Sequence, residues 1–170
     1  MFAYCSLWAR CVLIKITMAQ FVFDEDLPVL GPLPADDIVR GVCRHMRNLN
    51  YSVLVEFKLK SKRRVDVIGL SKSGKFVIVE VKSSYNDFRS DKKWLEYLPF
   101  ADQLYFAVAN GFPIEILPKG CGVMVADAYN AHILRKAPVC SMNATRRKSQ
   151  HIQYAKTAAN RLYQTIDERF

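Results

Sequence analysis

Apolar residues recur at helical spacing in the segment that begins after residue 34. They lie three or four positions apart, which gives a helix one buried stripe, and they are Ile38, Val42, Met46 and Leu49. Asp36 and Asp37 precede this stripe, and acidic side chains are favoured near the positive end of a helix dipole. The pattern predicts a helix that opens at residues 34–37, with Asp36 as its N-cap and with neither aspartate as a metal ligand.

Strict alternation replaces helical spacing between residues 52 and 58. Because side chains alternate faces along a strand, Val53, Val55 and Phe57 would share one face and Glu56 would lie on the other. The segment predicts a strand, with Glu56 either solvated or turned toward the next strand.

Residues 64–82 hold two apolar runs on either side of a Lys-Ser-Gly turn signal, which is the pattern of a β-hairpin. If the loop has three residues and Gly74 adopts the left-handed conformation, the numbers of paired residues add up to 146. Asp66 then lies opposite Glu80. A loop one residue longer would place these two carboxylates on opposite faces of the sheet.

The two faces of this hairpin differ in character. One face is uniformly apolar and must be buried; it carries Val65, Val67, Val77, Val79 and Val81. The other face is apolar near the turn and polar beyond it; it carries Asp66, Ile68, Ile78, Glu80 and Lys82, with Arg64 opposite Lys82. Because opposed carboxylates destabilise a sheet, a partner cation is implied. Lys82 can be that cation in a salt-bridged sheet end, or Mg²⁺ can bind, since it takes one or two carboxylates and keeps waters that a phosphate can replace.

The rest of the chain predicts a second helix, three further strands and a final helix. Their ranges are 83–97, 103–109, 122–126, 132–135 and 143–170. Ser83, Ser84 and Asn86 are candidates for the cap of the second helix. The final helix is basic on one side, and its other side carries apolar residues that we expect to pack on the domain: Ile152, Ala155, Ala159, Leu162 and Ile166.

Length and charge narrow the class of protein. A chain of 170 residues with 51% hydrophobic residues is long enough for one domain with a substantial core. Its net charge of +9 favours a polyanionic partner, with nucleic acid ahead of a membrane surface. The expected divisions are an irregular lead-in (1–34), a central domain (35–140) and a basic amphipathic C-terminal helix (141–170). Met18 is an alternative start, in which case residues 1–17 are not translated.

The sequence has no clear membrane span, signal peptide, zinc-binding motif or disulfide pattern. No stretch reaches the roughly eighteen consecutive apolar residues of a membrane span, and Arg10 and Lys15 interrupt the apolar start in a way that argues against a signal peptide. The 5 cysteines are scattered and lack C-x-x-C spacing, which fits reduced thiols and argues against a zinc site or a disulfide scaffold. We therefore expect a cytoplasmic protein.

Cations cluster immediately before Asp66. The basic residues of this run are Lys58, Lys60, Lys62, Arg63 and Arg64. Such a run is often only solvated, but its position beside Asp66 suits the positioning of a phosphate, and Arg64 would lie closest to it. Lys62, Arg63 and Arg64 are therefore candidates for DNA binding, and the final helix adds two more, Arg146 and Arg147.

The spacing Asp66, thirteen residues, then Glu80-Val81-Lys82 resembles the core of the PD-(D/E)XK nuclease superfamily. More of the chain, residues 38–138, resembles the MmcB-like DNA-repair family of that superfamily. The segments that carry this resemblance are 55–57, 63–68, 78–84, 87–89, 91–94, 104–108, 116–118 and 126–129.

The resemblance implies an α/β fold with a restriction-endonuclease-like core, in which a mixed central sheet is flanked by helices and residues 35–140 form the nuclease domain. It implies catalytic residues Asp66, Glu80, Lys82 and Glu56, with Mg²⁺ or Mn²⁺ bound by Asp66, Glu80 and the Val81 carbonyl. Lys82 would hold or help to deprotonate the attacking water, which requires burial to lower its pKa. In related nucleases the helix after the E-x-K strand faces the substrate, so Lys92, Trp94 and Tyr97 are secondary candidates, although such aromatic residues are more often part of the core. Lys92 and Lys93 are also candidates for DNA binding.

The predicted function is that of a Mg²⁺- or Mn²⁺-dependent DNA endonuclease, or a nuclease-like factor, in DNA repair. DNA is the expected partner, a second copy of the chain and other repair proteins are further candidates, and no membrane is expected. One rival is a Holliday-junction-type resolvase, which would need a symmetric dimer. The other is a non-catalytic DNA-binding module on the same fold.

Overall fold

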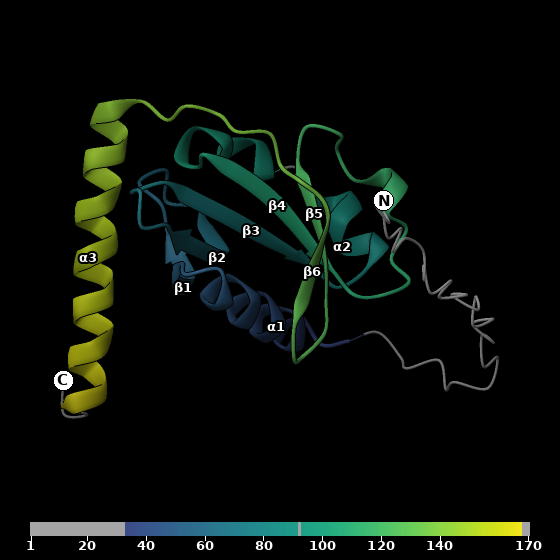
Figure 1. Ribbon diagram of the computed structural model, residues 1–170, viewed down its shortest axis with the longest axis horizontal. Coiled ribbons are helices and arrows are strands. Elements are labelled where there is room, and N and C mark those ends of the chain that lie inside the picture. The colour runs from purple at the N-terminus through teal and green to yellow at the C-terminus, as the bar shows by residue number, and fades with distance from the viewer. Residues whose placement is uncertain (1–32, 92, 168–170) are drawn as a thin grey trace, which may run out of the picture.

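A six-stranded sheet with its strands in sequence order runs through the protein (Figure 1). The computed structural model describes residues 33–91 and 93–167. The elements are α1 (Ala35–Asn48), β1 (Ser52–Lys58), β2 (Arg64–Leu70), β3 (Phe76–Lys82), α2 (Tyr85–Ser90), the 3-10 helices η1 (Lys93–Glu96) and η2 (Leu98–Phe100), β4 (Gln103–Val108), η3 (Ile114–Ile116), β5 (Gly122–Ala126), β6 (Ala131–Arg135) and α3 (Ala144–Ile166). The six predicted strands are confirmed within one residue at each end. The lead-in before residue 33 lies outside the described residues.

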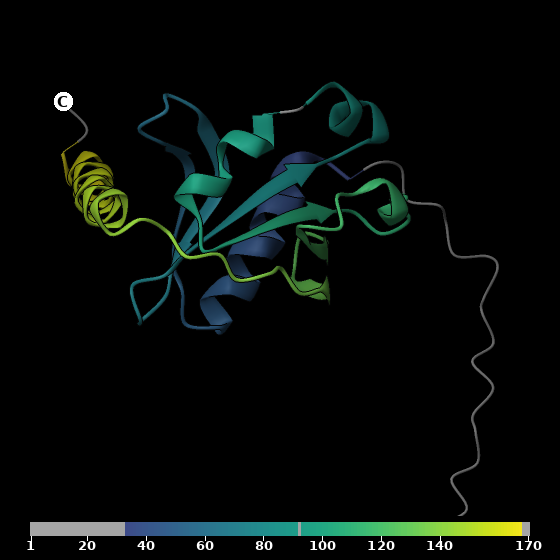
Figure 2. The same ribbon diagram turned by 90° about the horizontal axis from the view of Figure 1, so that it is seen from above.

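Strand directions make this a mixed sheet. The pairs β1–β2, β2–β3 and β5–β6 are antiparallel, whereas β3–β4 and β4–β5 are parallel. The parallel pair β3–β4 requires a crossover, which α2, η1 and η2 provide. In the two views, α1 lies across one face of the sheet and this crossover across the other (Figure 2). The predicted α/β architecture with a mixed sheet flanked by helices is therefore confirmed.

The β2–β3 hairpin has the predicted register. Its paired residues run from Val67 with Val79 to Leu70 with Phe76, and their numbers add up to 146. Gly74 has a φ of 74°, the left-handed conformation that glycine adopts without strain. A three-residue loop, and not a longer one, therefore connects the two strands.

The first helix begins one residue earlier than its predicted cap. Ala35 is its first residue and Pro34 its N-cap, so Asp36 lies inside the first turn and its predicted role as N-cap is wrong. Proline at this place has no N–H to satisfy and a φ that suits the start of a helix. Ile38, Val42 and Met46 are buried as predicted, but Leu49 is the C-cap and is 50% exposed.

Strand β1 changes face at Glu56. Val53 packs with the core cluster under α1, whereas Phe57 belongs to the cluster on the opposite face of the sheet. Glu56 between them has a φ of 49°, which rotates the chain out of strict alternation. Val65, which pairs with Phe57, follows it to that second cluster. The prediction that Val65 shares a face with Val67 is therefore wrong.

The segment predicted as one helix over residues 83–97 is broken into shorter pieces. Helix α2 is capped by Ser84, whose hydroxyl accepts a hydrogen bond of 3.2 Å from the N–H of Asp87. It ends at Ser90, its C-cap Asp91 has extended backbone angles, and 3-10 helices follow. At the break, the Asp91 carboxylate accepts the N–H of Lys93, a local bond of the kind that competes with helix, and it also accepts a bond from Lys82.

Helix α3 stands beside the β1 end of the sheet (Figure 1). It contacts the sheet through polar groups and through the buried ring of Tyr154, which packs against Phe57 and Phe76. Tyr154, Gln153 and Arg161 donate hydrogen bonds to main-chain carbonyls of β1, the edge strand. The apolar residues predicted to pack on the domain are all exposed: Ile152, Ala155, Ala159, Leu162 and Ile166. That prediction is wrong, because the helix instead turns toward the sheet the face that carries Tyr154 and the donors to the unpaired carbonyls of the edge strand.

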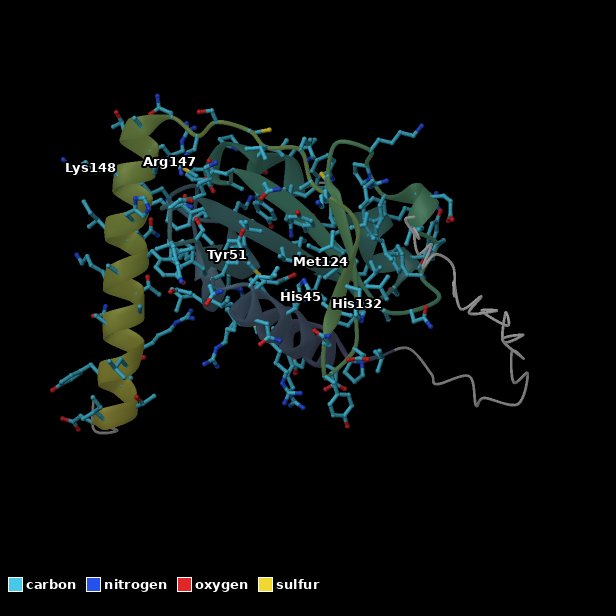
Figure 3. The ribbon with its side chains drawn as sticks, viewed as in Figure 1. His45, Tyr51, Met124, His132, Arg147 and Lys148 are labelled. Carbon is cyan, nitrogen blue, oxygen red and sulfur yellow. The ribbon has the colours of Figure 1, made fainter. Side chains whose placement is uncertain are left out.

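The N-terminal end of α3 is fixed by a buried ion pair. Arg147 donates hydrogen bonds of 2.8 and 2.6 Å to Asp102, whose side chain also accepts the Phe76 N–H and is 3% exposed. Arg147 points toward the sheet, whereas Lys148 points away from it (Figure 3). The guanidinium and the Phe76 N–H hold the pKa of Asp102 below its usual range, despite the opposing effect of burial.

Arg147→Ala is expected to lower the free energy of unfolding by about 3 kcal/mol, because it leaves the Asp102 carboxylate buried without its cation. Denaturant unfolding at neutral pH measures this change. Arg146→Ala is the matched control, since Arg146 is exposed and its guanidinium contacts the Pro99 carbonyl and the Phe100 ring, and it should cost less than about 1 kcal/mol. Equal losses for both variants would show that the pair does not fix α3.

Candidate active site

The Asp66 carboxylate reaches the segment that contains Glu80, Val81 and Lys82. The β2–β3 pairing ends at Val67, and beyond it Asp66 Oδ2 accepts a hydrogen bond of 2.7 Å from the N–H of Val81. Burial raises the pKa of Asp66, although the Val81 N–H and the charge of Lys82 oppose this. The structure therefore brings together the three side chains that the hairpin register predicts.

Glu80 is a carboxylate in a buried position, 5% exposed. Its Oε1 lies 3.4 Å from the Nζ of Lys82, and its Oε2 has no hydrogen-bond partner among the described residues. Burial and then the charge of Asp66 raise the pKa of Glu80 to about 8. A buried carboxylate oxygen without a donor is expensive for the fold, and a cation beside it would remove that cost.

Lys82 lies among three carboxylates. Its Nζ is 2.7 Å from Asp91, 3.4 Å from Glu80 and 4.0 Å from Asp87, and the residue is 3% exposed. Burial alone would lower the pKa of Lys82, but the bond to Asp91 and the surrounding negative charges raise it above its ordinary value. The pKa of Lys82 is therefore raised and not lowered as expected, and its ammonium donates a hydrogen bond to Asp91.

Asp91 and Asp87 were not predicted as site residues. Asp91 accepts from Lys82 and from the N–H of Lys93, and these bonds hold its pKa below the usual range against the effect of partial burial. Asp87 accepts from the N–H of Ser83. The prediction of a continuous helix over residues 83–97 gave no reason to place these two aspartates beside Lys82. An aspartate at the end of the helix that follows the E-x-K strand could have indicated them.

Glu56 lies near the site without facing into it. Its carboxylate forms an ion pair with Arg64, and its charge contributes to the raised pKa of Asp66. Arg63 is held by Glu96 through two hydrogen bonds of 2.7 Å. Lys62 is exposed. These positions place Glu56 and Arg64 at the rim of the site, and their catalytic and DNA-binding roles stay predictions.

The other predicted DNA contacts are dispersed. Lys93 is exposed on η1, Arg146 and Arg147 lie on α3, and Lys92 lies outside the described residues. Because Arg147 is committed to Asp102, its guanidinium has a structural partner.

The fit of a divalent cation depends on Asp66 and Glu80. Among residues 33–91 and 93–167, no group of three or more His, Cys, Asp or Glu side chains could hold a metal ion. Two carboxylates with added main-chain and water oxygens nevertheless suit Mg²⁺, which binds few protein ligands and keeps several waters. The free Oε2 of Glu80 and the raised pKa of both acids fit such an ion.

Divalent-metal affinity is expected to rise with pH, because Glu80 with a pKa of about 8 must lose its proton to ligate. Mn²⁺ affinity measured by calorimetry should increase about tenfold per pH unit from pH 6 and level off above pH 8. The stability of the metal-free protein changes in the opposite direction. Because the pKa of Glu80 is raised by folding, the free energy of unfolding falls as pH rises from about 4.5 to 8. Glu80→Gln should therefore remove metal binding and make the metal-free protein more stable at pH 8. A flat pH profile of Mn²⁺ affinity in the wild type would contradict this account.

A family model described as DNA repair protein MmcB-like matches residues 33–169. The chain belongs to the MmcB-like DNA repair family. The match covers the sheet, the candidate site and α3. It confirms the MmcB-like part of the resemblance drawn from the sequence and supports a role in DNA repair for this MmcB-like protein.

A similar solved structure is that of the SPO1766 protein of unknown function from Silicibacter pomeroyi. It is 40% identical, has a TM-score of 0.77, and the similarity covers 82% of this chain and 95% of that one. No curated protein matches the sequence. Among the described residues of the MmcB-like chain, no helix is long and apolar enough to cross a membrane.

Proposed function

We propose that this MmcB-like protein is a Mg²⁺- or Mn²⁺-dependent DNA nuclease with a PD-(D/E)XK site on a restriction-endonuclease-like core. The observation that carries the proposal is the buried Glu80 carboxylate, with one oxygen free, beside Asp66 and within reach of the Lys82 ammonium. Carboxyl groups with shifted pKa values that lie close to a fixed cation are typical of catalytic sites.

Asp66 and Glu80 would hold the ion, with the Val81 carbonyl as a third protein ligand. A divalent ion supplies Lewis-acid stabilisation of a phosphoryl oxygen and lowers the pKa of a bound water. The Asp66 side chain is oriented by the Val81 N–H, so its second oxygen is presented in a fixed direction. Glu80 needs to give up its proton before it can ligate, which ties activity to pH.

Lys82 would act as a donor toward the attacking water or a phosphate oxygen. Its raised pKa keeps it charged at neutral pH, so it contributes positive charge and direction and does not remove a proton. Asp91 is a positioning residue, because its 2.7 Å bond fixes the ammonium while Glu80 lies 3.4 Å away. Arg64 and Lys62 at the exposed rim would contact the phosphates on either side.

A non-catalytic DNA-binding module is the second candidate. The missing third ligand among the described side chains favours it, since an ion pair of Lys82 with Asp91 could persist without metal. A resolvase would require a symmetric dimer in addition to the same site.

Purified protein incubated with Mg²⁺ or Mn²⁺ and a panel of duplex, single-stranded, nicked and four-way DNAs tests the proposal. We expect cleavage of at least one substrate, no cleavage with EDTA, and none by an Asp66→Ala variant prepared in parallel. Binding of these DNAs without cleavage under any metal condition would establish the module instead. Cleavage restricted to four-way DNA by a dimer would establish the resolvase.

A further inference from the structure

A groove of about 470 Å³ lies between α3 and the loop that joins β1 to β2. Seven residues line it: Lys60, Ser149, Ile152, Gln153, Lys156, Thr157 and Asn160. None of them is acidic. Two ammonium groups and four hydroxyl or amide side chains thus surround one open channel, with a single apolar residue among them.

Most of these polar groups are available to a ligand. Within residues 33–91 and 93–167, no hydrogen bond or ion pair engages the side chains of Lys60, Ser149, Lys156 or Asn160. Gln153 is different, because it donates to the Lys58 carbonyl and so joins the loop to the helix. The groove therefore has fixed walls and unused donors.

The donors follow one face of α3. Ser149, Gln153, Lys156 and Asn160 recur at three- and four-residue intervals, so they lie above one another on the helix. From Ser149 to Asn160 the helix rises roughly 16 Å, and phosphates of one B-form strand lie about 3.4 Å apart along the axis. The row is long enough to contact a few successive phosphates, and lysine, serine, asparagine and glutamine are side chains that bind them.

The groove adjoins the candidate active site through the next residue of the helix. Arg161 donates hydrogen bonds of 2.5 and 2.9 Å to the carbonyls of Val55 and Glu56. Glu56 in turn pairs with Arg64 at the rim of the site, and its charge acts on Asp66. A strand that passes the rim would therefore continue along α3.

We infer that this groove binds the sugar-phosphate backbone of the DNA outside the cleaved bond. The inference rests on the proposed function only in taking DNA as the ligand, since the groove itself needs no metal. Its contacts are made by charge and by hydroxyl and amide donors, so binding in the groove is independent of base sequence and sensitive to salt.

The test is the double variant Lys60→Glu/Lys156→Glu, with Lys119→Glu/Lys136→Glu as its control. Both lysine pairs are exposed, and both double variants lower the net charge from +9 to +5, because each of two lysines changes by two charges. Binding of a labelled 20-nucleotide DNA, its duplex and the same sequence in RNA is measured in EDTA at several salt concentrations. Circular dichroism and thermal unfolding verify that each variant is folded, and Lys60→Gln/Lys156→Gln serves as a milder second variant.

We expect the groove variant to lose about tenfold or more in DNA affinity and the control less than threefold. The slope of log affinity against log salt should fall by roughly 1.4 to 1.8 for the glutamine variant, which corresponds to two lost phosphate contacts. Equal losses in the two glutamate variants, tighter binding of RNA than of DNA, or a changed oligomeric state of the groove variant would each overturn the inference. Wild-type protein that binds through the groove but never cleaves would refute the nuclease proposal alone.

Discussion

Asp66→Asn is expected to reduce DNA cleavage by about a thousandfold or more at saturating Mg²⁺, with the fold retained. The asparagine keeps the size of the side chain and an oxygen that can accept the Val81 N–H, so the local structure has no reason to change. What it removes is the negative charge that an ion needs. Rates of cleavage on the best substrate of the panel, together with the thermal shift produced by Mn²⁺, measure the effect.

Asp66→Asn should also change the titration of Glu80, which substitution of a purely structural residue would not do. The charge of Asp66 is the second cause of the raised pKa of Glu80, so its removal should lower that pKa. Titration of Glu80 followed by NMR in the metal-free protein detects this shift. Asp36→Asn, at an exposed position in the first turn of α1, is the control and should leave both cleavage and the Glu80 titration unchanged. Loss of the fold in Asp66→Asn would assign Asp66 a structural role instead.

Lys82→Met is expected to slow turnover about a hundredfold or more while Mn²⁺ affinity at pH 8.5 changes less than tenfold. Methionine preserves the volume of the buried stem but removes the ammonium that lies between Asp91 and Glu80. Because Lys82 lowers the pKa of Glu80, its loss should raise that pKa and weaken metal binding more at pH 6.5 than at pH 8.5. Single-turnover cleavage and Mn²⁺ calorimetry at both pH values separate the two effects.

Asp91→Asn provides the comparison for Lys82. If Asp91 only positions the ammonium, its variant should lose about tenfold in turnover and keep the metal affinity of the wild type. Unchanged cleavage by Lys82→Met would remove Lys82 from the catalytic set and leave the ion pair with Asp91 as a structural contact.

Local signals in the sequence were sufficient for the strands and for the centre of the site. Gly74 and the Lys-Ser-Gly turn determine the register of the hairpin from Val67 to Leu70, and this register brings Asp66 to the end of the pairing, where its carboxylate accepts the N–H of Val81, the neighbour of Glu80. Alternation and turn residues are properties of short segments, so they can be recognised in the sequence alone.

The errors arose where distant segments decide the outcome. The left-handed backbone of Glu56 moves Phe57 and Val65 to the other face of the sheet, and no residue type in β1 signals it. Asp91 caps the end of α2, and its carboxylate is bonded to Lys82, nine residues earlier, a contact that the helical pattern does not reveal. Likewise, the polar bonds of α3 to the edge strand outweighed its apolar stripe, since the carbonyls of β1 need donors that the helix periodicity does not reveal.

Crystals of the protein grown with Mn²⁺ and measured at a wavelength where manganese scatters anomalously test the central claim most directly. We predict an anomalous peak within ligand distance of both Asp66 and Glu80, at pH 8.5 and absent from the Asp66→Asn variant. An empty position between these carboxylates at millimolar Mn²⁺, with Lys82 and Asp91 still paired, would contradict the account.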